Sequence, residues 1–305
     1  MRRLAFKKID AFATAASAGN PAGAVYLQPG EEISAEEMQQ MARELKGFVT
    51  EVGFVRPLDA ATFDLKYYSS EREVEFCGHA TIAILYDLFK NDEALRKKPA
   101  VDIVTRKGRL RVENRLERED AVFISAPRPR FSPTVVDRTR LAEALRTDAG
   151  CLAGALPLKT VNAGLETLLV PVRTLPAILA LAPHLAELRR FCESNALDIV
   201  TVFTDEVANP ANAYRTRVFA PTFGYLEDPA TGSGNAALGY YLLAQQAWDG
   251  GTLSLEQNGD LARPNSVKLL ARQDERQEWQ VLFGGGAITK IDGTYLLGTK
   301  ASGCF

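Results

Sequence analysis

Two glycine turns, each followed by an apolar segment typical of a helix, carry the residues with the clearest chemical potential. The first turn reads Cys77-Gly78-His79 and the second reads Thr231-Gly232-Ser233. A glycine turn that starts a helix leaves backbone N–H groups without intrahelical partners, and the helix dipole adds positive potential there. Two such helix starts facing one cleft would bind a substrate carboxylate. The alternative is that the glycines only permit tight turns.

A single carboxylate, Glu51, stands in an apolar strand-like segment beside Val52 and Gly53. Enclosing a carboxylate in such surroundings is costly unless it has a partner or a purpose. Glu51 is therefore a candidate base for proton transfer. The competing interpretation is an edge residue held in a salt bridge.

The length and composition of the chain are those of an ordinary globular protein. The 305 residues suit two domains of about 150 residues each. Hydrophobic residues make up 46% and charged residues 24%, and the net charge is −2. That balance attracts neither nucleic acid nor an anionic membrane, so we expect a small-molecule ligand. We see no stretch of roughly 20 apolar residues that would span a bilayer.

The cysteines and histidines predict no metal centre. Four cysteines are scattered and there are only two histidines, so neither a disulfide framework nor a Cys/His zinc site is expected. The N-terminus is basic but lacks the apolar run of a signal peptide, which favours a reducing cytoplasm. We assign no role to a group of residues that look structural or incidental, namely Cys151, His184, Cys192 and Cys304.

The chain repeats itself. A turn and strand near Asn20 recur near Asn162, and each is followed by a helical pattern. The first helix is expected from Ser34 to Leu45, with Ser34 and Glu37 forming a capping box. Its counterpart in the second half is expected at 175–195. Three further pairs of elements recur in the same order: the strands 48–55 and 198–203, the strands 63–68 and 214–219, and the helices after the two glycine turns.

Aligning the repeats sets Gly78 against Gly232 and Cys77 against Thr231. Matching Val-Thr pairs would place Glu51 opposite Val202, so the carboxylate has no counterpart. Further strands are expected at 100–105, 109–113, 121–125, 251–256, 266–271, 278–283 and 287–291.

This pattern predicts an α+β fold of two pseudo-symmetric half-domains. Each half is a curled, mostly antiparallel sheet around a central apolar helix. Because Pro127-Arg128-Pro129-Arg130 interrupts both periodicities, it is the best linker candidate. We expect half-domains at 1–126 and 127–285, and a C-terminal strand in 286–305 that returns to the first half.

Taken together, several motifs resemble the phenazine-biosynthesis PhzF-like family over essentially the whole chain. They are Gly19-Asn20-Pro21-Ala22-Gly23, Glu51, Glu73-Val74-Glu75-Phe76-Cys77-Gly78-His79-Ala80-Thr81, Phe219-Ala220-Pro221, Glu227-Asp228-Pro229-Ala230-Thr231-Gly232-Ser233-Gly234, Glu256-Gln257-Asn258-Gly259, Arg263-Pro264 and Phe283-Gly284-Gly285-Gly286-Ala287. The resemblance implies a diaminopimelate-epimerase-like fold with the site between the halves, a homodimer, and a cofactor-independent isomerase of the dihydro-hydroxyanthranilate isomerase type.

In such relatives a glutamate moves the proton, assisted by a histidine and an aspartate. The matching positions here are Glu51, His79 and Asp228. The expected substrate is small and bears a carboxylate, and a role in phenazine biosynthesis is one possibility. The residues expected to bind it are Asn20, Ser69, Cys77, Gly78, Thr231, Gly232 and Ser233.

Epimerases of this fold use two facing cysteines, and this chain has a thiol at only one of the two positions. The position opposite Cys77 is Thr231, whose hydroxyl is far too weak an acid to replace a thiol. We therefore expect a single base, Glu51, that returns the proton to another carbon. Two alternatives stay open: a thiol-assisted amino-acid or hydroxy-acid epimerase or racemase that uses Cys77, and a non-catalytic ligand-binding or interaction protein. Cys77 itself is either a small buried hydrophobe or a helix-start thiolate.

Overall fold

A computed structural model describes residues 1–133, 135–152 and 156–298. The chain divides into two compact units. Of the described residues, unit 1 contains Met1–Phe12, Asn20–Ile124 and 286–298, and unit 2 contains Ala13–Gly19 and those in Ser125–Gly285. The ranges 1–126, 127–285 and 286–305 remain our proposal for the domain limits, and the boundary between Ile124 and Ser125 supports it. Cys304 lies outside the described residues.

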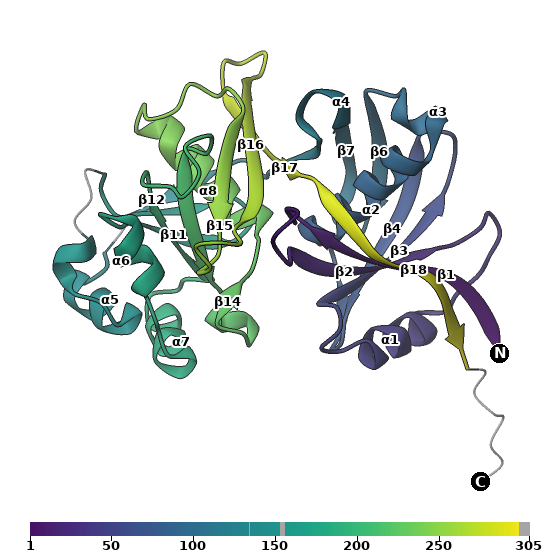
Figure 1. The fold of residues 1–305 in the computed structure, drawn as a ribbon, viewed down its shortest axis with the longest axis horizontal. Coiled ribbons are helices and arrows are strands. Elements are labelled where there is room, and N and C mark those ends of the chain that lie inside the picture. The colour runs from purple at the N-terminus through teal and green to yellow at the C-terminus, as the bar shows by residue number, and fades with distance from the viewer. Residues whose placement is uncertain (134, 153–155, 299–305) are drawn as a thin grey trace, which may run out of the picture. The chain divides into compact units, whose positions relative to one another are not determined.

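Unit 1 is a curved mixed sheet with one helix in its centre (Figure 1). Its strands are β1 (Arg2–Ala11), β2 (Asn20–Tyr26), β3 (Glu51–Pro57), β4 (Thr62–Ser69), β5 (Glu73–Val74), β6 (Ala100–Thr105), β7 (Gly108–Arg115), β8 (Ala121–Ser125) and β18 (Ala287–Leu297). Its helices are α1 (Ala35–Glu44), α2 (Gly78–Asn91), α3 (Glu93–Arg96) and α4 (Leu116–Glu119).

The strands of unit 1 pair in the order β18-β1-β2-β3-β4-β6-β7-β8, with β5 beside β4. The β2–β3 and β4–β6 pairs are parallel and the others are antiparallel. Helix α2 is apolar on nearly all sides, and its residues from Ala80 to Asp87 are buried, as expected for a central helix. Helix α1 covers a second core and begins with the predicted capping box of Ser34 and Glu37.

Unit 2 repeats this architecture. Its strands are β9 (Arg130–Ser132), β10 (Lys159–Asn162), β11 (Glu166–Pro171), β12 (Ile199–Thr204), β13 (Tyr214–Phe219), β14 (Glu227–Asp228), β15 (Leu253–Gln257), β16 (Asn265–Gln273) and β17 (Trp279–Gly285). Its helices are α5 (Arg138–Leu145), α6 (Leu175–Ala180), α7 (Leu185–Ser194) and the buried α8 (Gly232–Ala244), with two 3-10 turns at Ala149–Leu152 and Pro221–Phe223.

The pairing order β9-β10-β11-β12-β13-β15-β16-β17, with β14 beside β13, has the same sequence of parallel and antiparallel pairs as unit 1. The predicted duplication and the α+β class are therefore confirmed. Helix α8 takes the place of α2, and α5, α6 and α7 cover the outer face of their sheet (Figure 1).

The strand register corrects one detail of the predicted alignment. Two residues of β4 pair with both β3 and β5, and the second of them, Tyr68, lies opposite Val52. Two residues of β13 likewise pair with both β12 and β14, and the second of them, Phe219, lies opposite Val200. This register sets Val52 against Val200, so Glu51 corresponds to Ile199 and not to Val202. The alignment of the two Val-Thr pairs was therefore wrong. Strand register is set by pairing with the neighbouring strands, and a short identity in sequence does not determine it.

Two element boundaries also differ from the predictions. The helix expected at 175–195 is two helices, since α6 ends before Pro183 and α7 begins after His184. A proline lacks the N–H that a continuous helix would need. The strand expected at 48–55 begins only at Glu51, because the chain makes a tight turn after α1 in which Gly47 has a φ of 82°. In the described part of the chain, no helix has the length and apolarity that a membrane crossing requires.

Candidate active site

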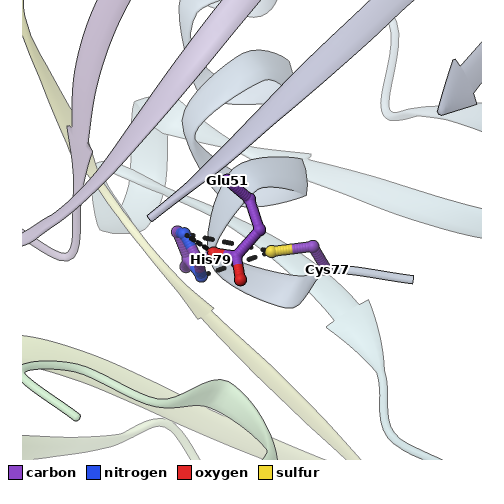
Figure 2. Close-up of side chains that lie close together, drawn as sticks. All are labelled: Glu51, Cys77 and His79. Atoms are coloured by element: carbon purple, nitrogen blue, oxygen red, sulfur yellow. Dashed lines mark hydrogen bonds and ion pairs between the residues drawn. The ribbon is translucent and has the colours of Figure 1, made fainter. Parts of the chain in front are cut away.

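Glu51, Cys77 and His79 lie side by side in unit 1 (Figure 2). The Nε2 atom of His79 lies 3.2 Å from a carboxylate oxygen of Glu51. The Nδ1 atom of His79 lies 3.3 Å from the sulfur of Cys77. The sequence predicted a function for each of these residues, and the fold brings all three into one cluster, which we call the Glu-Cys-His cluster.

Local structure explains how the cluster forms. Glu51 is the first residue of β3, where it pairs with Ala22 of β2 and with Ser69 of β4. Cys77 is the N-cap residue of α2, and His79 is the second residue of that helix. The first residue of a strand and the first turn of a helix therefore meet at one point, and their side chains converge there.

The thiol of Cys77 sits over the imidazole ring rather than in its plane. Its sulfur is 3.3 Å from Nδ1 and 3.9 Å from Nε2. A sulfur placed along the in-plane lone pair of one nitrogen would be much farther from the other nitrogen. Cys77 is 8% exposed and is the N-cap residue of α2, and a part for its thiolate in the chemistry stays a prediction.

His79 is neutral at neutral pH. Burial lowers the pKa of His79, because an enclosed imidazolium loses its hydration, and the nearby Glu51 carboxylate opposes this only in part. A neutral ring carries one proton on one nitrogen, so its hydrogen-bond partners decide which nitrogen is the donor.

Thr50 is a site residue that the sequence did not single out. Its hydroxyl donates to the carbonyl oxygen of Pro21 at 2.9 Å and lies 2.9 Å from Nε2 of His79. Since the hydroxyl proton is donated to Pro21, Thr50 accepts a hydrogen bond from Nε2–H of His79, and Nδ1 is then the nitrogen without a proton. The only available signal was its position directly before Glu51.

Replacing Thr50 by Val should change the hydrogen bonding of Nε2 of His79, since the Glu51 carboxylate oxygen at 3.2 Å is then the acceptor that remains for its proton. A net contribution of about 0.5–1.5 kcal/mol for one hydrogen bond corresponds to roughly a 2- to 10-fold loss of kcat/KM. Nitrogen NMR of histidine-labelled protein is well suited to this test, because the chain has only two histidines. The exposed His184 serves as the internal reference, and Thr50→Ser should keep the wild-type spectrum. Unchanged ring shifts in Thr50→Val would refute the assignment.

The other predicted substrate-binding residues of unit 1 have clear structural settings. Asn20 is buried at the start of β2, with its Oδ1 3.4 Å from the Thr50 hydroxyl. Ser69 accepts hydrogen bonds from the backbone N–H groups of Glu71 and Arg72, so its hydroxyl stabilises the β4–β5 turn. Gly78 begins α2.

The remaining predicted residues lie in unit 2. Asp228 ends the two-residue strand β14, and the next helix, α8, has Thr231 as its N-cap residue and Gly232 and Ser233 in its first turn. A Cβ at Gly232 would lie 2.3 Å from the ring of Phe283, so only glycine fits there.

Gln257 holds this turn together and was recognised only as part of a motif. Its buried side-chain oxygen accepts from the backbone N–H of Thr231 at 2.9 Å and from the Asn235 amide at 2.6 Å. Its side-chain nitrogen donates to the carbonyl oxygen of Asp228 at 2.9 Å. One glutamine thereby fixes both the start of α8 and the backbone of Asp228.

Known proteins are similar to this chain in sequence and in fold. The family model described as "Phenazine biosynthesis-like protein" matches residues 9–293. An uncharacterized isomerase of Bacillus subtilis is 29% identical over 272 residues, which cover 88% of this chain and 91% of that protein. The trans-2,3-dihydro-3-hydroxyanthranilate isomerase of Pseudomonas chlororaphis is 26% identical, covering 95% of this chain and 98% of that protein.

Among solved structures, a PhzF-family protein of Bacillus anthracis superposes with a TM-score of 0.86. That match is 23% identical in sequence and covers 97% of this chain and 100% of the other, so it shows a shared fold. Together with the relatives named as isomerases, the family match settles the class of the protein. The chain belongs to the phenazine biosynthesis-like PhzC-PhzF family, and it is an isomerase.

Proposed function

We propose that this isomerase moves a proton between two carbon atoms of a small carboxylate-bearing substrate, with Glu51 as the single base and without a cofactor. The observation that supports it best is the setting of Glu51, whose side chain is 23% exposed beside the neutral His79. Within the described residues, no lysine or arginine nitrogen lies within 4.0 Å of the Glu51 carboxylate. A purely structural salt bridge is therefore a poor explanation for this residue.

In the proposed reaction, the Glu51 carboxylate removes a proton from one carbon. The electron pair of the broken C–H bond moves through the conjugated substrate, and Glu51 then delivers the proton to a different carbon. His79 orients the substrate and donates or accepts hydrogen bonds as charge shifts, and Asp228 assists from unit 2. Backbone N–H groups at the starts of α2 and α8 bind the carboxylate, near Gly78 and near Gly232 and Ser233.

Trans-2,3-dihydro-3-hydroxyanthranilate is the first substrate to test, because a relative of similar length is named for it. The protein should convert it in heavy water without added metal or cofactor, and proton NMR should show hydrogen appearing at a new carbon. A single base that retains its proton gives partial return of the substrate hydrogen, whereas free exchange with solvent gives full deuterium labelling. If the protein converts neither this compound nor other cyclic carboxylates, the proposed substrate class is wrong.

A thiol-assisted epimerase or racemase is the second candidate, and the contact between Cys77 and His79 favours it. In that reaction the thiolate of Cys77 would remove the proton and solvent deuterium would enter with loss of stereochemistry. The two mechanisms predict different inactive variants. Cys77→Ser should abolish turnover by the epimerase mechanism, whereas Glu51→Gln should abolish turnover by the single-base mechanism.

The pH dependence should report the neutral form of His79. Because burial lowers its pKa, the ring gains a proton only below the ordinary histidine value of about 6.5. A protonated His79 would pair with the Glu51 carboxylate and withdraw the base from catalysis. We therefore expect kcat/KM to fall as the pH falls through the lowered pKa, and this acid limb to change in His79→Gln. An acid limb centred above 6.5 would contradict the assignment.

We further propose a homodimer and a cytoplasmic location, both suggested by the family. Light scattering of the purified protein tests the first, and cell fractionation tests the second. A monomer at micromolar concentration would rule out a stable dimer.

A further inference from the structure

We propose that the Glu-Cys-His cluster binds one thiophilic divalent cation, Zn²⁺ or Cd²⁺, and that this ion inhibits the enzyme. Metal binding stands on the geometry of the cluster alone, whereas inhibition rests on the proposed role of Glu51 as the base. The cluster lies entirely within unit 1.

The three side chains offer suitable ligands. A thiolate, an imidazole and a carboxylate are the ligand types that bind zinc in proteins, and the thiolate selects soft metals over Mg²⁺ and Ca²⁺. One ligand atom from each residue can be chosen so that all three lie within 4.8 Å of one another. The charges also match, since a thiolate and a carboxylate together balance a divalent cation.

The distances are close to those of a tetrahedral site. Zinc bonds of 2.0–2.3 Å at tetrahedral angles separate ligand atoms by roughly 3.4–3.6 Å. Here Nε2 of His79 is 3.2 Å from the Glu51 oxygen and 3.9 Å from the Cys77 sulfur. An ion bound at Nε2 replaces the proton that points to Thr50, so the neutral ring then carries its proton on Nδ1. The sulfur must still move, because an ion bound to the imidazole lies in the ring plane and the thiol now sits over the ring face. We expect a rotation about the Cα–Cβ bond of Cys77 to make that movement without displacing the backbone.

The surroundings favour binding and leave a route to the cluster. Cys77 is the N-cap residue of the 14-residue helix α2, whose positive end stabilises a thiolate. Glu51 retains 23% exposure, so an ion can reach the cluster from solvent on that side. Three protein ligands leave a fourth position for water, which is the pattern of an open zinc site.

Spacing along the sequence does not reveal this site. Zinc motifs are recognised by paired Cys and His at short intervals, and here the carboxylate comes from the start of β3 while the other two ligands come from the start of α2. An ion held there occupies the carboxylate oxygen that proton transfer needs, which is why we expect inhibition.

Cobalt is the most informative probe, because Co²⁺ replaces Zn²⁺ and is coloured. Titration of the full-length protein with Co²⁺ should produce tetrahedral visible bands and a thiolate-to-metal band in the near ultraviolet, at one ion per chain, and Zn²⁺ should remove both. Cys77→Ser should lose the thiolate band and weaken binding by more than about 100-fold, since even indirect supporting residues contribute about 10–100-fold. Cys151→Ser, which changes a partly exposed thiol elsewhere, is the matched control and should keep the band.

A second measurement protects the test against a variant that fails to fold. In the wild-type protein, Zn²⁺ should slow the alkylation of Cys77 by iodoacetamide, and a chelator should restore it. Absence of the thiolate band in wild type, or a band that survives Cys77→Ser, overturns the metal site. If the band forms but Zn²⁺ leaves turnover unchanged, the inhibition and the role of Glu51 fail while the metal site stands. If turnover is found without any band, the metal site alone fails.

Discussion

Replacing Glu51 by Gln should lower kcat by about 10²–10⁴-fold, the usual contribution of a positioned acid or base. Glutamine keeps the size and the hydrogen-bonding shape of glutamate, so substrate binding should change little. The loss should appear in kcat and in kcat/KM together, because proton removal occurs only in the transition state. The measurement is turnover of the proposed substrate, trans-2,3-dihydro-3-hydroxyanthranilate, with hydrogen exchange followed by NMR in parallel.

Glu75 provides the matched control, because it is an exposed glutamate two residues before Cys77. Glu75→Gln makes the same chemical change close to the cluster and should retain wild-type turnover. A Glu51→Gln enzyme with near-normal kcat would remove Glu51 as the base. If Cys77→Ser were inactive in the same assay, the thiol mechanism would take its place.

The largest loss of stability should come from replacing Arg215 by Met in unit 2. Arg215 and Glu256 form an ion pair of 3.1 Å with side chains 0% and 1% exposed. The guanidinium also donates to backbone oxygens of Asn258 and Asp260, and Glu256 accepts from the backbone N–H groups of Ala208 and Asn209. Removing one partner of such a buried pair leaves an uncompensated charge, which typically costs about 3–5 kcal/mol.

Tryptophan fluorescence in urea measures the unfolding of unit 2, which contains Arg215. Both tryptophans of the chain, Trp248 and Trp279, belong to unit 2. The matched control is Arg128→Met, which removes the partly exposed ion pairs with Asp274 and Glu278 and should change the free energy of unfolding by about 1 kcal/mol or less. Equal midpoints for the two variants would show that the buried pair contributes nothing beyond an exposed one.

The sequence alone determined the elements that depend on local chemistry. The apolar runs after Gly78 and Gly232 identified the two central helices, because a helix without a polar face must be buried. The Ser34 capping box identified the start of α1. Repetition of these local signals in one order was enough to predict a duplicated α+β fold, and the family motifs named Glu51 and His79 as site residues.

Only the tertiary structure decided which side chains touch. The contacts of Thr50 with His79, and of Gln257 with Thr231, join residues whose types carry no functional signal of their own. The same is true of strand register, which set Glu51 opposite Ile199 in the repeat and left its carboxylate beside His79. Helix and strand periodicity depends on residues a few positions apart, whereas hydrogen bonds between distant segments depend on how sheets pair and where helices begin, and the linear pattern does not encode those distances.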